Sequence, residues 1–224
     1  MGKRDIKIFY LHGFRGHYEC GKKIKFLKKN YGGENVIGYD LYDEPLVNIK
    51  KIDKDITGNY YYQEKLFVGT SLGGYYAQVL ASIFDAHSLL INPVIEPENE
   101  LKKYLNTEYS SFKDETKKIT ITNKSLKDFK YVTNKYINKD SQSYQNNAFI
   151  KEIWIGGLDP LQSDINKIKN YFSDYTLTIF NNEVHRFNSF DVEFPKFYER
   201  ILNHKFTAEF SDSIAFDWLL REDD

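Results

Sequence analysis

A glycine-flanked serine is the feature of this chain with the clearest chemical meaning. Residues 69–73 read Gly-Thr-Ser-Leu-Gly, which has the form G-x-S-x-G with Ser71 at its centre. Residues 65–68 before it are predicted to form a short buried strand, and apolar side chains between Tyr75 and Phe84 recur at helical spacing. A strand, such a serine and then a helix are the setting of a nucleophile elbow, in which the helix N-terminus favours a developing anion. The pattern predicts a nucleophilic Ser71, and a glycine turn without chemistry is the alternative.

A serine nucleophile needs a histidine base, and His185 is the histidine in the expected place. Serine is a weak nucleophile until a base takes its proton, and in this design the chain order is Ser, then Asp or Glu, then His. His185 follows a predicted strand at residues 176–180 and precedes a helix predicted within residues 187–204. The other four histidines lie before the serine, in or beside a buried strand, or late in the last helix: His12, His17, His87 and His204.

The acid that pairs with His185 is expected in the loop after the strand that precedes the predicted strand at residues 176–180. Residues 153–160 read Ile-Trp-Ile-Gly-Gly-Leu-Asp-Pro, a strand that runs into a glycine-opened loop. Asp159 in that loop is the predicted acid. Asp164 is the alternative acid, although its position before a predicted helix at residues 164–172 suits a helix N-cap.

An oxyanion hole completes this chemistry, because donors aimed at the developing negative charge stabilise the transition state. One donor is predicted to be the backbone N–H of Leu72, directly after the nucleophile. The other is predicted in the loop after the first strand, where residues 12–16 read His-Gly-Phe-Arg-Gly. We assign the backbone N–H of Phe14. We expect His12 to shape this loop rather than act as a base, and Arg15 to be solvated or, alternatively, to meet an anionic substrate.

The elements that must position these residues alternate along the chain. Predicted strands at residues 6–11, 35–39, 66–69, 87–91, 149–155 and 176–180 are separated by predicted helices. Such alternation indicates an α/β fold, with a mostly parallel sheet covered by helices on both faces. At 224 residues, we expect one domain that spans residues 1–224.

Residues 101–150 interrupt the alternation. They contain ten lysines against five acidic residues, an excess of +5, with scattered aromatic side chains that include Tyr144. A structureless loop of this length would be unusual. We therefore expect a small, partly helical insertion at about residues 96–148. This insertion is either a solvated segment on the surface or a cap over the substrate, and the sequence leaves both alternatives open.

Composition excludes several classes of protein. With 31 basic and 32 acidic side chains the formal net charge is −1, which does not favour a nucleic-acid binder. Cys20 is the single cysteine, so no intrachain disulfide forms, and it belongs to no metal-ligand pattern. No apolar run is long enough to span a bilayer. We expect a cytoplasmic protein that needs no metal or organic cofactor. The sequence does not indicate its oligomeric state.

These motifs together resemble the α/β-hydrolase superfamily and, more narrowly, the YqiA-like esterases. The matching pieces are Tyr-Leu-His-Gly-Phe at residues 10–14, the run at residues 69–77, Asn-Pro at residues 92–93, and His185. The resemblance implies the α/β-hydrolase fold with a short insertion, a serine esterase or thioesterase activity, and the roles of nucleophile, acid and base for Ser71, Asp159 and His185. The family tends to have asparagine where this chain has Arg15.

Hydrolysis of a small-molecule carboxylic ester or thioester is therefore the leading expectation. Two alternatives remain open. An acyltransferase would use the same triad to pass the acyl group to an alcohol or amine, and a ligand-binding protein on a hydrolase fold would not be catalytic at all.

Overall fold

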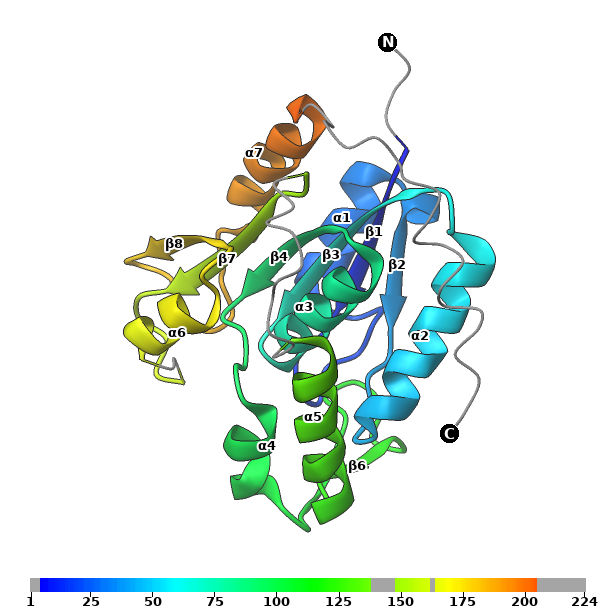
Figure 1. Ribbon diagram of the computed structural model, residues 1–224, viewed down its shortest axis with the longest axis vertical. Coiled ribbons are helices and arrows are strands. Elements are labelled where there is room, and N and C mark those ends of the chain that lie inside the picture. The colour runs from blue at the N-terminus through cyan, green and yellow to red at the C-terminus, as the bar shows by residue number, and fades with distance from the viewer. Residues whose placement is uncertain (1–4, 138–147, 162–163, 205–224) are drawn as a thin grey trace.

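The computed structural model describes residues 5–137, 148–161 and 164–204. Six strands form one sheet in the order β2-β1-β3-β4-β7-β8, and every neighbouring pair is parallel (Figure 1). The α/β fold predicted from the alternation of elements is confirmed. The strands are β1 (Ile6–Leu11), β2 (Val36–Tyr39), β3 (Glu64–Thr70), β4 (His87–Ile91), β7 (Lys151–Gly156) and β8 (Thr176–Phe180).

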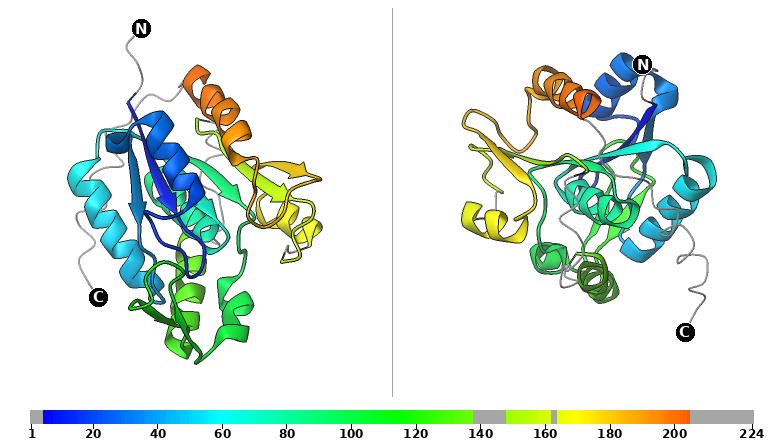
Figure 2. Two further views of the ribbon diagram at one scale, coloured as in Figure 1. Left: turned by 180° about the vertical axis from the view of Figure 1, so that it is seen from behind. Right: turned by 45° about the horizontal axis from the view of Figure 1, so that its top comes forward.

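Helices cover both faces of the sheet. On one face lie α1 (Lys22–Tyr31) and α7 (Phe190–Asn203), which are in front when the molecule is seen from behind (Figure 2, left). On the other lie α2 (Pro45–Asn59), α3 (Leu72–Phe84) and α6 (Ile165–Tyr171). Strand side chains alternate between the two layers, so Tyr10 packs with α1 and α7 whereas Phe9 packs with α2 and α3.

Strand β4 and helix α3 form the centre of this core. All five residues of β4 are buried, as expected for a parallel strand covered on both faces. Helix α3 is buried from Leu72 to Ala81, because the sheet lies on one side of it and a further helix on the other. On that outer side, the hydroxyl of Tyr75 donates to the carbonyl oxygen of Phe129, 3.1 Å away. The nucleophile candidate is thus attached to a helix that is enclosed on both sides.

The insertion between β4 and β7 lies beyond the carboxyl ends of the strands, at the bottom of Figure 1. It contains α4 (Pro97–Glu100), a 3-10 helix η2 (Leu101–Tyr104), an antiparallel hairpin of β5 (Glu108–Ser110) and β6 (Lys118–Thr120), and α5 (Asn123–Tyr136). It is partly helical, as expected, but the hairpin was not predicted. Its remaining residues 138–147, which include Tyr144, lie outside the described residues. A second 3-10 helix, η1 (Gly33–Asn35), precedes β2.

Candidate active site

Ser71 occupies a strained turn between β3 and α3. Its φ of 56° and ψ of −123° lie in the positive-φ region that side-chain-bearing residues seldom adopt. A Cβ atom on Gly69 would collide with the carbonyl oxygen of Gly73, and one on Gly73 would collide with the carbonyl oxygen of Leu11. Only glycine fits at both positions, because the turn closes on itself and on the end of β1. A strained turn of this kind, closed by two glycines, agrees with the nucleophile elbow that the sequence predicts.

The segment after β4 holds Ser71 from both sides. The Ser71 N–H donates to the carbonyl oxygen of Ile91 at 2.9 Å, and the Ser71 carbonyl accepts from the N–H of Val94 at 3.2 Å. A Cβ atom on Gly74 would lie 2.8 Å from the Cβ of Pro93, so the first turn of α3 packs tightly on this segment. The position of the candidate nucleophile is therefore tied to residues 91–94.

Asp159 and His185 meet at the ends of β7 and β8. Asp159 Oδ2 lies 2.7 Å from His185 Nδ1, and the other carboxylate oxygen accepts from the N–H of Leu161 at 2.9 Å. The Asp159 side chain is 1% exposed and the His185 side chain 30% exposed. Both carboxylate oxygens thus have partners, and Nε2 is the imidazole nitrogen left for chemistry. Among the described residues, His185 has no hydrogen bond to Ser71 Oγ; such bonds often tighten only when substrate binds.

Asp164, the alternative acid, has another role in the structure. It is the N-cap of α6, and its Oδ1 accepts from the N–H of Asn166 at 2.8 Å. The aspartate that contacts His185 is Asp159.

The loop that bears His185 is anchored by Glu183. Its carboxylate accepts from the N–H groups of Asn188 at 2.5 Å and Ser189 at 2.9 Å. Burial opposes ionisation, but the hydrogen bonds from Ser189 and Asn188, together with the nearby Lys23 ammonium, hold the pKa of Glu183 below its ordinary value. An ionised carboxylate therefore fixes the turn that follows the base.

Asn92 is a polar residue at this site to which the sequence analysis assigned no role beyond the Asn-Pro pair of the family resemblance. It is 6% exposed and directly follows β4. Its side chain accepts from the N–H of Gly156 at 2.7 Å and donates to the carbonyl oxygens of His185 at 3.1 Å and Val184 at 3.3 Å. The signal in the sequence is an asparagine between a buried strand and a proline, since asparagine tolerates positive φ and carries both a donor and an acceptor.

The predicted oxyanion loop lies against the nucleophile. The N–H of Gly16 donates to the carbonyl oxygen of Gly13 at 2.9 Å, which makes Phe14 and Arg15 the central residues of a turn. A Cβ atom on Gly13 would lie 3.2 Å from the Cβ of Ser71. The backbone N–H groups of Phe14 and Leu72 have no acceptor among the described residues. Neither predicted donor is therefore engaged by another group in the described part of the chain.

His12 holds this loop in place through both of its ring nitrogens. Its Nδ1 lies 2.8 Å from the carbonyl oxygen of Gly13, to which it donates, and its Nε2 accepts from the N–H of Leu41 at 3.1 Å. Burial, the largest effect, lowers the pKa of His12 and favours the neutral ring that these bonds require. Both ring nitrogens are occupied, as expected for a histidine that shapes the loop.

Arg15 is bound to the insertion. Its φ is 63°, its Nε donates to the carbonyl oxygen of Ser110 at 2.9 Å, and its guanidinium lies 4.3 Å from the ring centre of Phe112. In return, the Phe112 N–H donates to the Arg15 carbonyl at 2.9 Å. Arg15 is therefore partly buried against the insertion rather than fully solvated, and contact with an anionic substrate stays a prediction. Next to it, the Phe14 ring lies 5.1 Å from that of Tyr104.

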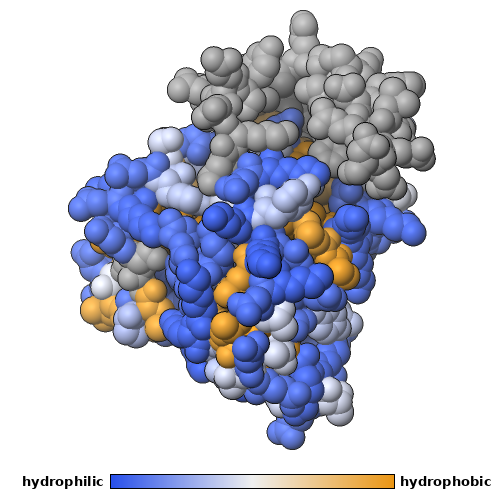
Figure 3. Space-filling model, turned by 60° about the horizontal axis from the view of Figure 1, so that its bottom comes forward, coloured by the Kyte–Doolittle hydropathy of each residue, from blue (hydrophilic) through white to orange (hydrophobic). Residues whose placement is uncertain are grey.

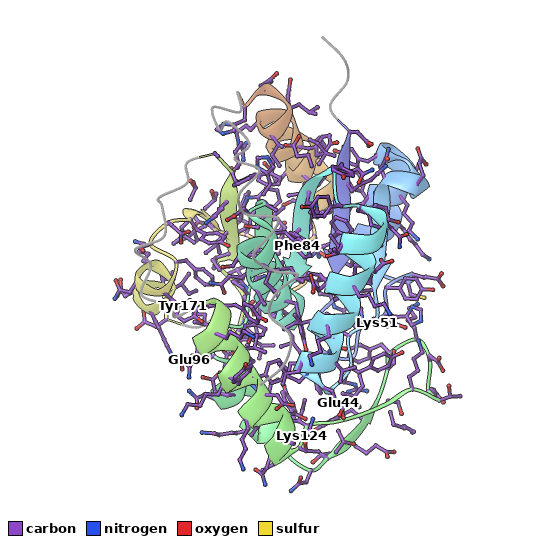
Figure 4. The ribbon with its side chains drawn as sticks, turned by 45° about the vertical axis from the view of Figure 1, so that its right-hand side comes forward. Glu44, Lys51, Phe84, Glu96, Lys124 and Tyr171 are labelled. Atoms are coloured by element: carbon purple, nitrogen blue, oxygen red, sulfur yellow. The ribbon has the colours of Figure 1, made fainter. Side chains whose placement is uncertain are left out.

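Lysines of the insertion also join it to the core. Lys117 forms an ion pair with Asp40, after β2. Lys124, at the start of α5, lies 3.5 Å from Glu44, just before α2 (Figure 4). Part of the positive charge of the insertion is therefore neutralised where it docks.

Apolar side chains are available beside the site. Figure 3 turns the bottom of Figure 1, where the insertion lies, toward the viewer, and apolar residues form separate groups there among hydrophilic ones. Leu158 and Leu161, on either side of Asp159 in sequence, are 60% and 57% exposed. In the described ranges, no helix combines the length and apolar character that crossing a membrane requires.

Comparison with known proteins identifies both a family and a fold. The family model UPF0227, Uncharacterised protein family, matches residues 7–201. A UPF0227 protein from Shewanella oneidensis is 28% identical over 102 residues, a match that covers 42% of this chain and 55% of that protein. The match thus spans about half the length of that relative.

Solved structures show the same architecture. Est1E from Butyrivibrio proteoclasticus superimposes with a TM-score of 0.62 at 15% identity, covering 91% of this chain and 90% of Est1E. A structure from the work on LipS and LipT, two metagenome-derived lipolytic enzymes, has a TM-score of 0.63 at 15% identity, covering 90% of this chain and 95% of that one. The fold shared with them is that of the α/β hydrolases.

Proposed function

The chain belongs to the UPF0227 family, the YqiA-like group that its motifs resemble, and its fold is that of the α/β hydrolases; from this premise we propose a serine hydrolase that cleaves carboxylic esters or thioesters. The observation that carries the proposal is the 2.7 Å contact between His185 and the buried Asp159, one strand away from the segment that holds the strained Ser71. LipS and LipT are lipolytic enzymes, which is in keeping with ester cleavage.

In the proposed reaction, Ser71 Oγ attacks the acyl carbonyl carbon while His185 Nε2 takes the hydroxyl proton. Asp159 keeps the remaining N–H on Nδ1 and stabilises the imidazolium. The carbonyl oxygen becomes an oxyanion that receives hydrogen bonds from the amides of Phe14 and Leu72. Each such donor is worth about 3 kcal/mol in the transition state.

Collapse of the tetrahedral intermediate breaks the bond to the alkoxide or thiolate, which takes the proton from His185. The acyl group then remains on Ser71. A water molecule attacks this acyl-enzyme, His185 again accepts a proton, and the carboxylic acid leaves as Ser71 regains its proton. Every proton in both halves passes through the one imidazole nitrogen that Asp159 leaves open.

We assign the insertion, at about residues 96–148, the role of a cap within a single α/β-hydrolase domain. Arg15 supports this role, because its backbone and side chain both bond to residues 110–112 of the insertion, next to the predicted oxyanion donor Phe14. The exposed Leu158 and Leu161 on the other side of the site favour an apolar group on the substrate.

A fluorophosphonate probe and a substrate panel test the proposal. We expect the probe to label wild-type protein at Ser71, with the adduct located by mass spectrometry, and to leave Ser71→Ala unlabelled. Esters and thioesters of graded acyl length, assayed with and without an added alcohol or amine, separate hydrolysis from acyl transfer. Folded wild-type protein that neither takes the label nor turns over any ester would overturn the assignment.

A further inference from the structure

We propose that Asn92 is a positioning residue that holds the acid loop and the base loop in register with the nucleophile. The inference rests on the proposed function, since it concerns the same triad. It assigns to one buried side chain the task of fixing two loops that are distant from it in sequence.

The side chain of Asn92 bridges the two loops directly. Its Oδ1 accepts from the N–H of Gly156, three residues before Asp159, at 2.7 Å. Its Nδ2 donates to the carbonyl oxygen of His185 itself at 3.1 Å and to that of Val184 at 3.3 Å. One amide group thus connects the end of β7, from which the acid loop starts, to the backbone of the base and of the residue before it.

The backbone around Asn92 reaches the nucleophile. Its own N–H donates to the carbonyl oxygen of Trp154 in β7 at 2.9 Å. The neighbouring Ile91 and Val94 form the two backbone hydrogen bonds that hold Ser71. A segment of four residues, 91–94, therefore contacts all three loops of the candidate triad.

Asparagine suits this place for two separate reasons. The φ of Asn92 is 44°, which asparagine and glycine adopt more readily than other residues. The amide also supplies both a donor and an acceptor, as the carbonyls of the base loop and the N–H of the acid loop require. Aspartate is nearly the same shape but, when ionised, would place negative charge against two carbonyl oxygens. The variants Asn92→Gly and Asn92→Asp consequently test different parts of the proposal.

Loss of this bridge should affect the chemical step more than substrate binding, because a displacement of about 1 Å at a reacting group costs on the order of 100-fold. For Asn92→Gly, whose backbone tolerates the same φ, we expect kcat to fall roughly 10- to 100-fold with KM within about twofold. The acidic limb of the kcat/KM profile should shift to lower pH, because a displaced Asp159 stabilises the imidazolium less. Asn92→Asp should be impaired at least as much.

Asp85→Gly is the matched control. Asp85 has the same φ of 44°, is exposed, and lies just before the opposite end of β4. We expect wild-type kcat and an unchanged pH profile for this variant. Circular dichroism melts of all three variants establish that they are folded, and the downfield proton resonance of the His185–Asp159 bond should move in the Asn92 variants alone.

The outcomes separate this inference from the function on which it rests. Suppose that the wild-type protein is active and that the Asn92 variants keep its kcat, the acidic limb of its kcat/KM profile and its downfield proton resonance. This result overturns the role of Asn92 but leaves the proposed hydrolase function intact. A wild type that neither labels nor hydrolyses removes the proposed function itself. If Asn92→Gly does not fold, the same measurements on Asn92→Asp and Asn92→Ser decide, and an equal kinetic loss in Asp85→Gly contradicts the proposal.

Discussion

Asp159 Oδ2 lies 2.7 Å from His185 Nδ1, although the two residues are 26 positions apart and follow different strands. The carboxylate is almost completely buried, whereas the imidazole is partly open to solvent. A buried acceptor on Nδ1 keeps a proton there and leaves Nε2 as the basic nitrogen.

Replacement of the nucleophile or the base should abolish most turnover. We expect Ser71→Ala and His185→Ala each to lower kcat by at least ~1000-fold with the fold intact, because the two residues act as a unit. The double variant should be little worse than either single one. Steady-state kinetics on purified protein, with circular dichroism as the control for folding, measure this, and near-wild-type turnover in either single variant contradicts the triad.

The two aspartates should respond very differently to the same substitution. Asp159→Asn is expected to lower kcat at least ~100-fold, because an amide can hold His185 in the wrong tautomer and does not offset its positive charge. Asp164→Asn should stay within about twofold of wild type, since asparagine caps a helix as well as aspartate does. A larger loss in Asp164→Asn than in Asp159→Asn would exchange the two roles.

The central strands of the main sheet could be predicted because they are buried on both faces. Such strands are nearly continuous apolar runs, and β1 and β4 have the bounds predicted from the sequence. The edge strand β8, whose residues are partly or fully exposed, also has the predicted bounds. The hairpin of β5 and β6 was missed because each strand has three residues, too few to show a period, and within them only Ile119 is buried. Short exposed strands depend on what they dock against.

The candidate site was predicted where chemistry restricts the residue type and missed where only contacts matter. Ser71 and His185 follow from chain order and strand ends. The partners of Arg15 and Asn92 do not, because Ser110 is 95 positions from Arg15 and His185 is 93 positions from Asn92. Local sequence gives no indication of which distant carbonyl a side chain reaches.

His12 should make stability depend on pH near neutrality. Its pKa is lowered from an ordinary value of 6.5, mainly by burial, so the unfolded chain binds more protons between the two values. The free energy of unfolding therefore rises with pH through this window, and the contribution is complete above the ordinary pKa. We expect wild-type stability to fall as pH drops below 6.5, and His12→Gln to show a shallower dependence.

Urea unfolding measured at several pH values tests this dependence. Asp40, beside His12, also has a lowered pKa: burial raises it, but the hydrogen bonds from Lys117 and Tyr18 outweigh burial. Its contribution is lost only as pH falls below its ordinary value of 3.8, whereas the contribution of His12 begins to be lost already below 6.5. Parallel pH dependences for wild type and His12→Gln would show that His12 is not the source.

Arg15 should support catalysis because its contacts with residues 110–112 of the insertion hold the oxyanion loop in place. Asparagine adopts positive φ readily, so Arg15→Asn keeps the turn and the backbone bond to Phe112 but removes the side-chain contacts to Ser110 and Phe112. We expect kcat/KM to fall roughly 10-fold, which corresponds to about 1.4 kcal/mol, because the amide of Phe14 is then less well fixed against the developing oxyanion. The loss should be equal for a neutral ester and for an acyl-CoA of the same acyl length.

Arg15→Lys distinguishes a role of Arg15 in binding the insertion from simple attraction of an anionic substrate. Lysine keeps the charge but lacks the planar fork that both donates to a carbonyl and stacks on a ring. If Arg15 grips the insertion, Arg15→Lys is impaired like Arg15→Asn. If it attracts the substrate, Arg15→Lys retains activity toward the acyl-CoA. A double-mutant cycle with Phe112→Ala, at a side chain that is 66% exposed, completes the test. The two losses should not add, because residues in contact share one interaction, and full additivity would mean that Arg15 and Phe112 act independently.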